Sequence, residues 1–280
     1  MPRDSRRLTG PEECFSPYDF CCSAEKKPGV AISDCMEVDN ARTDGRISSQ
    51  LRPVFLRAGV VSQARGSAYI ELNQTKVICS VYGPREVLRR EDFSLKGQLT
   101  CDFKFLTFSC KQRRMHQQDE HEKDMAVRIL EAMESSVCLH KYPKSQINIY
   151  VMVLQNDGSA LSAAILASCV ALASAGIEMY DLVLASSVAI CGTQMLTDPT
   201  AQEEDAILDS SEKVESAGIT TMAFLPSVNQ VSAVSFDGQV SLDTLKQSQQ
   251  VCIENCQKIY QVVRQCLVTY AMEKRKLKGR

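Results

Sequence analysis

Four acidic residues gather on a polar stretch in the second half of the chain. They are Asp198, Glu203, Glu204 and Asp205. Carboxylates this close in sequence could bind a divalent cation or serve as general acid and base. In many proteins, however, acidic residues clustered on a polar loop are simply solvated surface residues with no binding or catalytic role. The spacing leaves both interpretations open.

A glycine turn between a strand-like run and an apolar run is a candidate phosphate site. The turn consists of residues 156–159 (NDGS), and the apolar run begins at Ala160. A helix that starts there would point backbone N–H groups and the positive end of its dipole at one spot, which suits a phosphate. The same junction is often only a turn. A strong phosphate site also needs the guanidinium of an arginine at the start of the helix, and the residue there is Ala160.

A basic cluster lies in a polar segment before the first predicted helix. Its members are Lys111, Arg113 and Arg114. Contacts with a nucleic-acid backbone need charge and reach rather than fixed geometry, so this segment could bind RNA. A solvated loop explains the same residues equally well.

The cysteine and histidine residues give no metal or catalytic motif. Cys252 and Cys256 are four apart on a predicted helix, but both lie on its apolar stripe, which favours core packing. His116, His121 and His140 belong to no triad or metal-spaced pattern, and we expect them at the surface. The sequence therefore predicts no metal site and no cofactor.

Composition indicates a globular intracellular protein. The chain has 280 residues, 44% of them hydrophobic, which is enough to bury a sizeable core. Its thirteen cysteines have irregular spacing and are expected to be reduced thiols of a cytosolic or nuclear protein. No apolar run reaches the roughly 18 residues of a membrane span, so no membrane association is expected.

The elements that must position these residues follow from hydrophobic periodicity. Residues 1–45 show no helix or strand period and are expected to form a flexible leader, residues 46–272 one domain, and residues 273–280 a basic tail. Helical spacing predicts helices over 119–138, 160–175 and 242–270. Alternation or short apolar runs predict strands near 54–60, 68–72, 77–81, 98–105, 147–153, 182–190, 220–225 and 228–236. The fold class is α/β (α+β), a single domain of mixed sheets packed with helices and closed by a long C-terminal helix.

Several sequence strings in one order resemble the RNase PH family. They are residues 66–71 (GSAYIE), 82–86 (YGPRE), 154–159 (LQNDGS), 171–177 (ALASAGI) and 181–183 (DLV), and the resemblance spans roughly residues 44–270. Within the family the chain looks most like the mRNA transport regulator type of RNase PH-like subunit in the ring of the eukaryotic RNA exosome. Residues 59–64 (GVVSQA), 198–200 (DPT) and 225–231 (LPSVNQV) support this narrower resemblance.

The resemblance implies an RNase PH-like fold in which the catalytic groups are degenerate. Active members cut RNA from its 3′ end with phosphate, which two arginines hold. The position of the turn arginine falls on Ala160. The position of the other falls on His121, or on Glu120 if the alignment slips by one residue.

The acidic positions of active members are only partly kept. Asp198 matches the first catalytic aspartate, while the second falls on Glu204, with Asp205 one residue late. The third position, around residues 216–220, has lost its acid. No residue is therefore expected to be catalytic.

The resemblance implies a non-catalytic subunit that scaffolds the exosome core ring and contributes to the RNA entry path in 3′-to-5′ RNA processing and degradation. Lys111, Arg113 and Arg114 are the candidate RNA contacts. The implied partners are other RNase PH-like ring subunits, exosome cap proteins and RNA threading the ring, in the nucleus, nucleolus and cytoplasm. Neighbours in a ring would also cover strand edges and apolar faces of this chain. One alternative is an active phosphate-dependent 3′-to-5′ exoribonuclease that borrows arginines from a neighbour, and a second is a stand-alone RNA-binding module.

Overall fold

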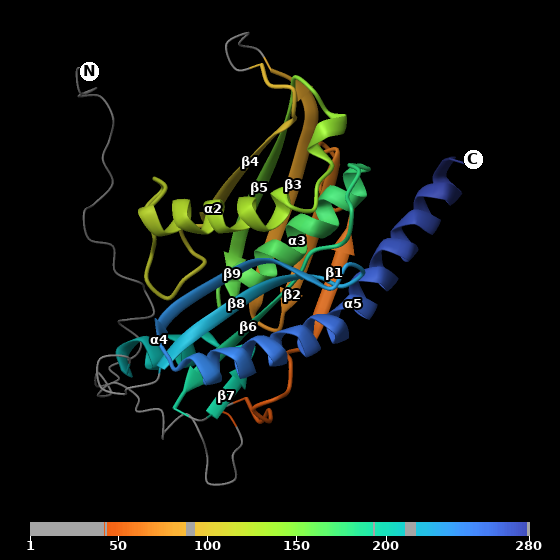
Figure 1. Ribbon diagram of the computed structural model, residues 1–280. Coiled ribbons are helices and arrows are strands. Elements are labelled where there is room, and N and C mark those ends of the chain that lie inside the picture. The colour runs from red at the N-terminus through yellow and green to blue at the C-terminus, as the bar shows by residue number, and fades with distance from the viewer. Residues whose placement is uncertain (1–41, 43, 88–92, 193, 211–216, 279–280) are drawn as a thin grey trace, which may run out of the picture.

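Two β-sheets enclose a buried helix, as seen in the computed structural model (Figure 1). The structure describes residues 42, 44–87, 93–192, 194–210 and 217–278. Most of the predicted leader, residues 1–45, lies outside the described residues. Arg42, Asp44 and Gly45 are described, and Arg42 is buried against the domain.

The first sheet contains the strands of the N-terminal half. These are β1 (Val54–Ala58), β2 (Gly66–Leu72), β3 (Thr75–Glu86), β4 (Gln98–Phe105) and β5 (Ser145–Gln155), in the order β1-β2-β3-β5-β4. All neighbours are antiparallel except β4 and β5, which are parallel and are joined through α2 (Glu120–Glu134) and the short 3₁₀ helix η3 (Leu139–Lys141). Alternate residues of β2 and β3 are buried, so one face of this sheet belongs to the core.

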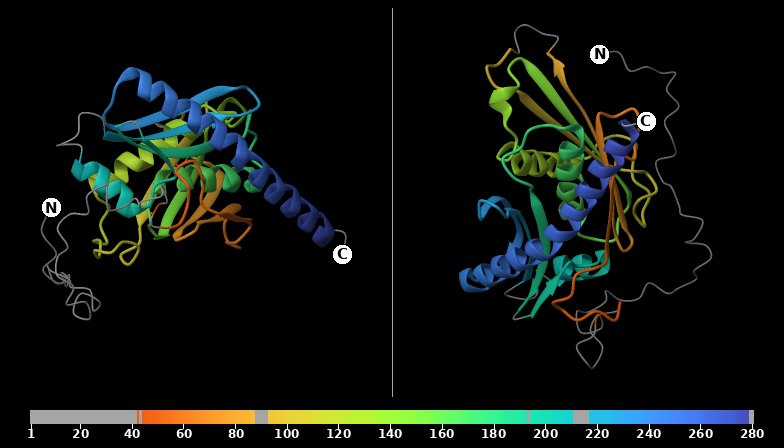
Figure 2. Two further views of the ribbon diagram at one scale, coloured as in Figure 1. Left: turned by 90° about the horizontal axis from the view of Figure 1, so that it is seen from below. Right: turned by 90° about the vertical axis from the view of Figure 1, so that its right-hand side faces the viewer.

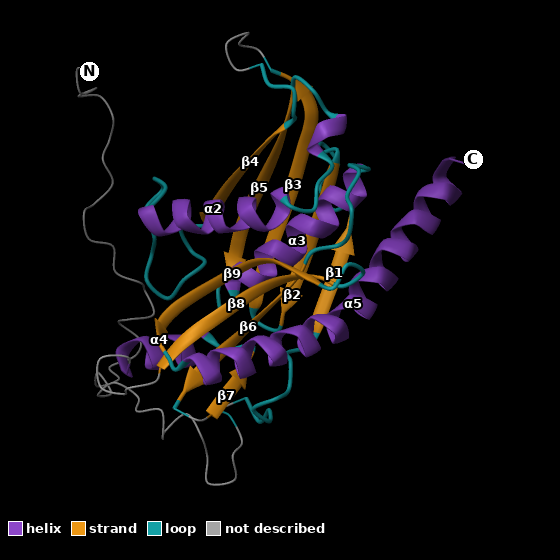
Figure 3. Ribbon diagram, viewed as in Figure 1, coloured by secondary structure: helices purple, strands orange, loops and turns teal. Residues whose placement is uncertain are grey.

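The second sheet follows the central helix α3 (Ala160–Ala175). Its strands are β6 (Leu184–Cys191), β7 (Gln194–Thr197), β8 (Ala217–Leu225) and β9 (Gln230–Gln239), all antiparallel in the order β7-β6-β8-β9. Helix α3 is buried on nearly every side because it contacts β2 and β3 of the first sheet as well as β6 of the second. Figure 3 shows the helix between the two sets of strands.

Two further helices complete the domain. Helix α4 (Ala201–Ser210) follows β7, and helix α5 (Leu242–Lys278) crosses β6, β8 and β1. The last turns of α5 extend beyond the body of the domain, where residues 271–276 are all exposed (Figure 2). The predicted basic tail, residues 273–280, is therefore helical as far as Lys278.

The predicted fold class is confirmed, since mixed sheets pack with helices and a long helix closes the chain. Two local predictions were wrong. The helix predicted over 119–138 ends at Glu134, because Val137 forms a β-bridge with Met179 instead. The acidic segment treated as a polar loop forms α4, which buries Ala206 and Ile207.

Candidate functional site

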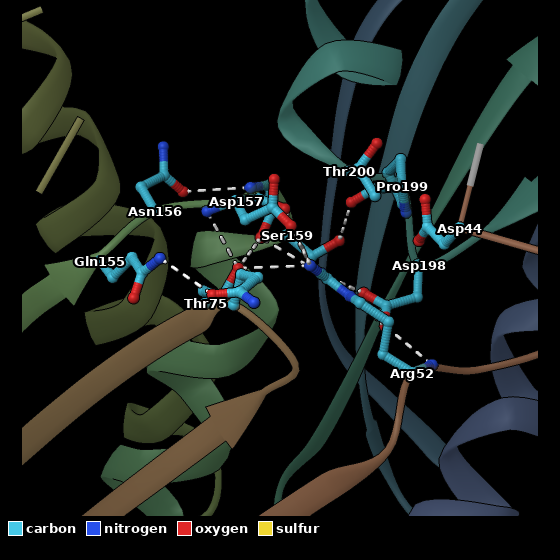
Figure 4. Close-up of polar contacts among 12 residues, drawn as sticks. Asp44, Arg52, Thr75, Gln155, Asn156, Asp157, Ser159, Asp198, Pro199 and Thr200 are labelled. Atoms are coloured by element: carbon cyan, nitrogen blue, oxygen red, sulfur yellow. Dashed lines mark hydrogen bonds and ion pairs between the residues drawn. The ribbon is translucent and has the colours of Figure 1, made fainter. Parts of the chain in front are cut away.

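The candidate site is built around the turn that starts α3 (Figure 4). Gly158 and Ser159 both have positive φ angles, of 82° and 52°. The hydroxyl of Thr75 accepts from the N–H of Asp157 at 3.1 Å and donates to the carbonyl of Gly158 at 2.9 Å. A Cβ atom on Gly158 would lie 2.5 Å from the carbonyl oxygen of Pro199, so only glycine fits here. The predicted turn geometry is present.

The buried side chain of Arg52 donates hydrogen bonds to the carbonyl groups of this turn. The Arg52 guanidinium donates to the carbonyls of Asp157 at 2.8 Å and Gly158 at 3.2 Å. It also forms a two-pronged ion pair with Asp198, with distances of 2.8 Å from Nε to Oδ2 and 2.7 Å from Nη2 to Oδ1. Burial by itself would raise the pKa of the Asp198 carboxyl, but the hydrogen bonds and charge of Arg52 outweigh it and lower that pKa. Asp198 is an ionised partner of Arg52 within the protein.

Two more arginines hold the backbone beside Asp198. Arg42 donates from Nη2 to the Asp198 carbonyl at 3.1 Å, and Arg46 donates from its own Nη2 to the same oxygen at 3.3 Å. Arg42 also pairs with Glu203, at 2.7 Å from Nε to Oε1, and donates to the carbonyl of Thr197 at 2.6 Å. Glu203 is buried and is fully engaged, because its other oxygen accepts from a backbone N–H at the start of α4.

Glu204 faces the amide of the residue that caps the N-terminus of the central helix. Its Oε1 accepts from the N–H of Ser159, the N-cap residue of α3, at 2.7 Å. Burial raises the pKa of the Glu204 carboxyl to about 7, against the opposing effects of the Ser159 N–H and the charge of Arg52. The position at which a helix N-terminus would hold an anion is thus taken by an acid of the same chain.

A cavity of about 650 Å³ opens in front of Glu204. One part of its wall is the segment from Cys110 to Met115, and another is acidic. The residues that line it include the basic group singled out from the sequence, Lys111, Arg113 and Arg114, and two of the four acids, Glu204 and Asp205. Asp205 is exposed, as are Lys111 and Arg113. The fold therefore joins the basic cluster and two of the acids in one site, while Asp198 and Glu203 lie behind it against Arg52 and Arg42.

Arg114 is the basic residue with fixed contacts. Its guanidinium lies over the ring of Phe105, 4.3 Å from the centroid, and 3.8 Å from the carboxylate of Asp119. The His121 ring stacks on the same phenylalanine at 6.4 Å between centroids. Burial and the charge of Arg114 lower the pKa of His121. His121 is exposed, as predicted, and is not among the described residues that line the cavity.

Ala160 is the first residue of α3 and is buried, so this position brings no cation to the site. The sequence analysis did not identify Arg42, Arg46 and Arg52 as site residues. A possible signal was the presence of three arginines within the short segment before β1, although their burial depends on acids about 150 residues away along the chain.

The remaining candidates do not line the cavity. Cys252 and Cys256 are fully buried in the hydrophobic core, as predicted. His116 and His140 are exposed. Within the described ranges, no group of three or more His, Cys, Asp or Glu residues is placed to hold a metal ion. In that same part of the chain, no helix is both long and apolar enough to cross a membrane.

Known proteins that resemble this chain include 3′ exoribonuclease family members and exosome components. Residues 50–178 match the family model for the 3′ exoribonuclease family (RNase PH), domain 1. The chain is 35% identical to Exosome complex component MTR3 of Homo sapiens over 97% of each chain. It is also 33% identical to Exosome complex component RRP41-like of Arabidopsis thaliana, over 82% of this chain and 86% of the relative.

Solved structures share the fold. Rice (Oryza sativa) Rrp46 superposes with a TM-score of 0.69 at 23% identity, covering 81% of this chain and 100% of the other. A subunit of the Archaeoglobus fulgidus exosome with RNA bound to the active site superposes with a TM-score of 0.67 at 21% identity, covering 80% and 92%.

Proposed function

The chain belongs to the RNase PH family of 3′ exoribonucleases, and from this premise we propose that it is a non-catalytic subunit of an RNA exosome ring. Its similarity to exosome components over nearly its whole length supports the ring assignment. Its partners are then other RNase PH-like ring subunits, exosome cap proteins and the RNA that threads the ring. Its role is to scaffold the complex and contribute to the RNA entry path in 3′-to-5′ RNA processing and degradation.

One observation carries the proposal that the chain is not catalytic. The Glu204 carboxyl lies 2.7 Å from the Ser159 amide, at the helix N-terminus where a phosphate would bind. A phosphate there would meet an acid, and the first helical residue, Ala160, supplies no opposing positive charge.

The free energy that the missing arginine contacts would supply supports the same conclusion. Each lost electrostatic contact with a reacting group typically removes about 2.7 to 4 kcal/mol of transition-state stabilisation. The two positions at which the family resemblance places arginines hold Ala160 and His121, or Glu120 if the alignment slips by one residue, and none of these supplies a guanidinium. Two such losses lower the rate by roughly 10⁴-fold or more. Asp198, the expected first catalytic aspartate, is meanwhile committed to Arg52.

The exposed cations at the cavity support a part in the RNA path. Lys111 and Arg113 are solvent-exposed, so they can reach a phosphate backbone without breaking a contact within the protein. Arg114 is held by Phe105 and Asp119 and can present only part of its guanidinium. RNA would thus be guided by flexible charges in front of a site that does not cleave it.

Calorimetric titration of the purified full-length chain with inorganic phosphate at pH 7.5 tests the proposed loss of phosphate binding. We expect no saturable heat up to millimolar phosphate. Binding in the micromolar range would overturn the proposal and favour the active phosphate-dependent exoribonuclease.

Co-expression with RNase PH-like ring subunits tests the scaffold role. We expect stable co-purification with these subunits and weak RNA binding by the isolated chain. Failure to co-purify, combined with tight and steeply salt-dependent RNA binding by the chain alone, would favour the stand-alone RNA-binding module. The proposed locations are the nucleus, nucleolus and cytoplasm, which a fluorescent fusion that still co-purifies with the ring would test.

A further inference from the structure

The two sheets end in four edge strands, and they differ in what covers their free edges. These strands are β1 and β4 in the first sheet and β7 and β9 in the second. An edge strand presents unpaired backbone N–H and C=O groups, which natural proteins normally cover or use for pairing. The contacts of each edge therefore show which of them the chain leaves available.

Side chains cover the edge of β4. The amide of Gln118 donates to the carbonyl of Phe103 at 3.1 Å. The buried carboxylate of Glu122 accepts from the backbone N–H of Phe105 at 2.9 Å. The last part of the free edge, from Phe103 to Phe105, is thereby satisfied by residues just before and within α2, and an incoming strand would have to displace them.

The edge of β7 is covered from within the chain, and that of β1 is covered in part, because a pocket of about 290 Å³ lies between β1 and α5. At β7, the N–H of Thr197 donates to the carbonyl of Ser48 at 2.9 Å, and the carbonyl of Thr197 accepts from Arg42. At β1, the carbonyl of Leu56 accepts from the Cys266 thiol at 3.4 Å, and α5 runs beside the strand. Both strands are short, with four residues in β7 and five in β1.

The fourth edge, that of β9, is the longest and has no such cover. The strand spans ten residues, Gln230–Gln239, and none of them is buried. In the part of the chain that the structure describes, no hydrogen bond outside the ladder with β8 reaches its backbone. Val231 and Val234 on this strand and Val228 before it are exposed by nearly half. A long, unpaired edge with exposed valines beside it is a template for pairing with another chain.

Helix α2 packs against β9, and β9 contributes only side chains to the hydrogen bonds between them. Arg128 donates to the hydroxyl of Ser235 at 2.5 Å and to the carboxylate of Asp237 at 2.8 Å. The hydroxyls of Ser135 and Ser232 lie 2.6 Å apart. These contacts fix the position of β9 under α2 and leave the strand's outward backbone groups unpaired. The strand is held in place for pairing.

We infer that the free edge of β9 is the docking edge for a β-strand of a neighbouring RNase PH-like ring subunit. This inference rests on the proposed function. The ladder of β9 with β8 is irregular at Ser232, and from Ala233 to Gln239 the alternating donors and acceptors of the edge match an extended strand. The exposed valines supply apolar contacts beside the new ladder. RNA does not fit this surface, because β9 contains no lysine or arginine and the nearby Arg128 is paired with Asp237.

Hydrogen–deuterium exchange tests the inference on the full-length chain, alone and in the ring assembled with its RNase PH-like partners. We expect amides within Gln230–Gln239 to exchange at least tenfold more slowly in the ring, and those of β4 to be unchanged. Unchanged exchange of β9 in an assembled ring would overturn this inference alone. Failure of the chain to assemble would instead overturn the proposed function.

A matched pair of substitutions provides a second test. Val234→Lys changes a valine that is 47% exposed on β9, and Val268→Lys changes one that is 45% exposed on α5. Both variants should fold with unchanged melting temperatures. We expect the β9 variant to bind the partner subunits on the order of tenfold more weakly, and the α5 variant to bind normally.

Two results would overturn the assignment. One is an equal effect of Val234→Lys and Val268→Lys on the affinity for the partner subunits, whether both variants bind normally or both bind weakly. The other is a homodimer of the isolated chain with β9 protected, which would identify a second copy as the occupant.

Discussion

Replacing Glu204 with glutamine removes the charge at the N-terminus of α3 and leaves its shape in place. The amide oxygen of glutamine can still accept from the Ser159 N–H, which lies 2.7 Å from Oε1 in the native protein. The change therefore isolates the electrostatic cost of keeping an acid at this position.

The size of that cost follows from the pKa. Burial raises the pKa of Glu204 from 4.5 to about 7. At 1.36 kcal/mol for each pKa unit, ionisation costs the folded state about 3 kcal/mol. This is an upper bound, because the dipole of α3 favours an anion at its N-terminus. The pKa of Glu204 is higher in the folded chain than in the unfolded chain. Protonation of Glu204 therefore stabilises the folded chain, and this contribution to the free energy of unfolding is complete below about pH 4.5. It is lost as the pH rises through about 7.

Urea denaturation between pH 4.5 and 8.5 measures this effect. We expect the free energy of unfolding of Glu204→Gln to exceed that of the wild type by an amount that grows with pH, up to about 3 kcal/mol. Asp205→Asn, which neutralises the exposed neighbouring carboxylate, controls for the change in net charge. Parallel curves for the wild type and Glu204→Gln would refute the conclusion that the Glu204 carboxyl is desolvated beside the Ser159 amide.

Three other changes test the remaining contacts. Arg52→Met leaves the carboxylate of Asp198 buried and unpaired, and should lower the free energy of unfolding by about 3 to 5 kcal/mol. Arg52→Met/Asp198→Leu should regain most of this loss, and an unstable double variant would contradict the account. Glu122→Ala uncovers the edge of β4 and should cost about 1 to 3 kcal/mol in the same assay, whereas wild-type stability would show that this cap is dispensable. Lys111→Ala/Arg113→Ala should reduce the slope of log affinity against log salt for RNA binding by the ring by about 1.4, and an unchanged slope would remove both from the RNA path.

Local patterns predicted most of the fold. The all-apolar run over 160–175 coincides with α3, because a helix that is hydrophobic on every side must be buried. The alternation in β2 and β3 likewise marks the face of the first sheet that α3 covers. Helix α4 was missed because only a short part of it is apolar, and its acidic residues have the composition of a surface loop.

The candidate site was less predictable, because its chemistry depends on distant partners. The sequence presents the four acids as one cluster, yet the fold gives them different environments. Asp198 pairs with Arg52 and Glu203 with Arg42, at separations of 146 and 161 residues along the chain. Glu204 faces the amide of Ser159. No local pattern reports such pairing, so neither the buried arginines nor the structural role of Asp198 could be predicted from it.

Phosphorolysis by the reconstituted ring tests the central claim most directly. The ring is incubated with 3′-labelled RNA, Mg²⁺ and phosphate, and release of nucleoside diphosphates is compared between wild-type chain and Glu204→Gln/Asp205→Asn. Asp198→Ala is unsuitable, because it would leave Arg52 buried without its partner. The account predicts the same rate of release, or none, from both rings. A phosphate-dependent rate that falls tenfold or more in the variant ring would show that this chain is catalytic.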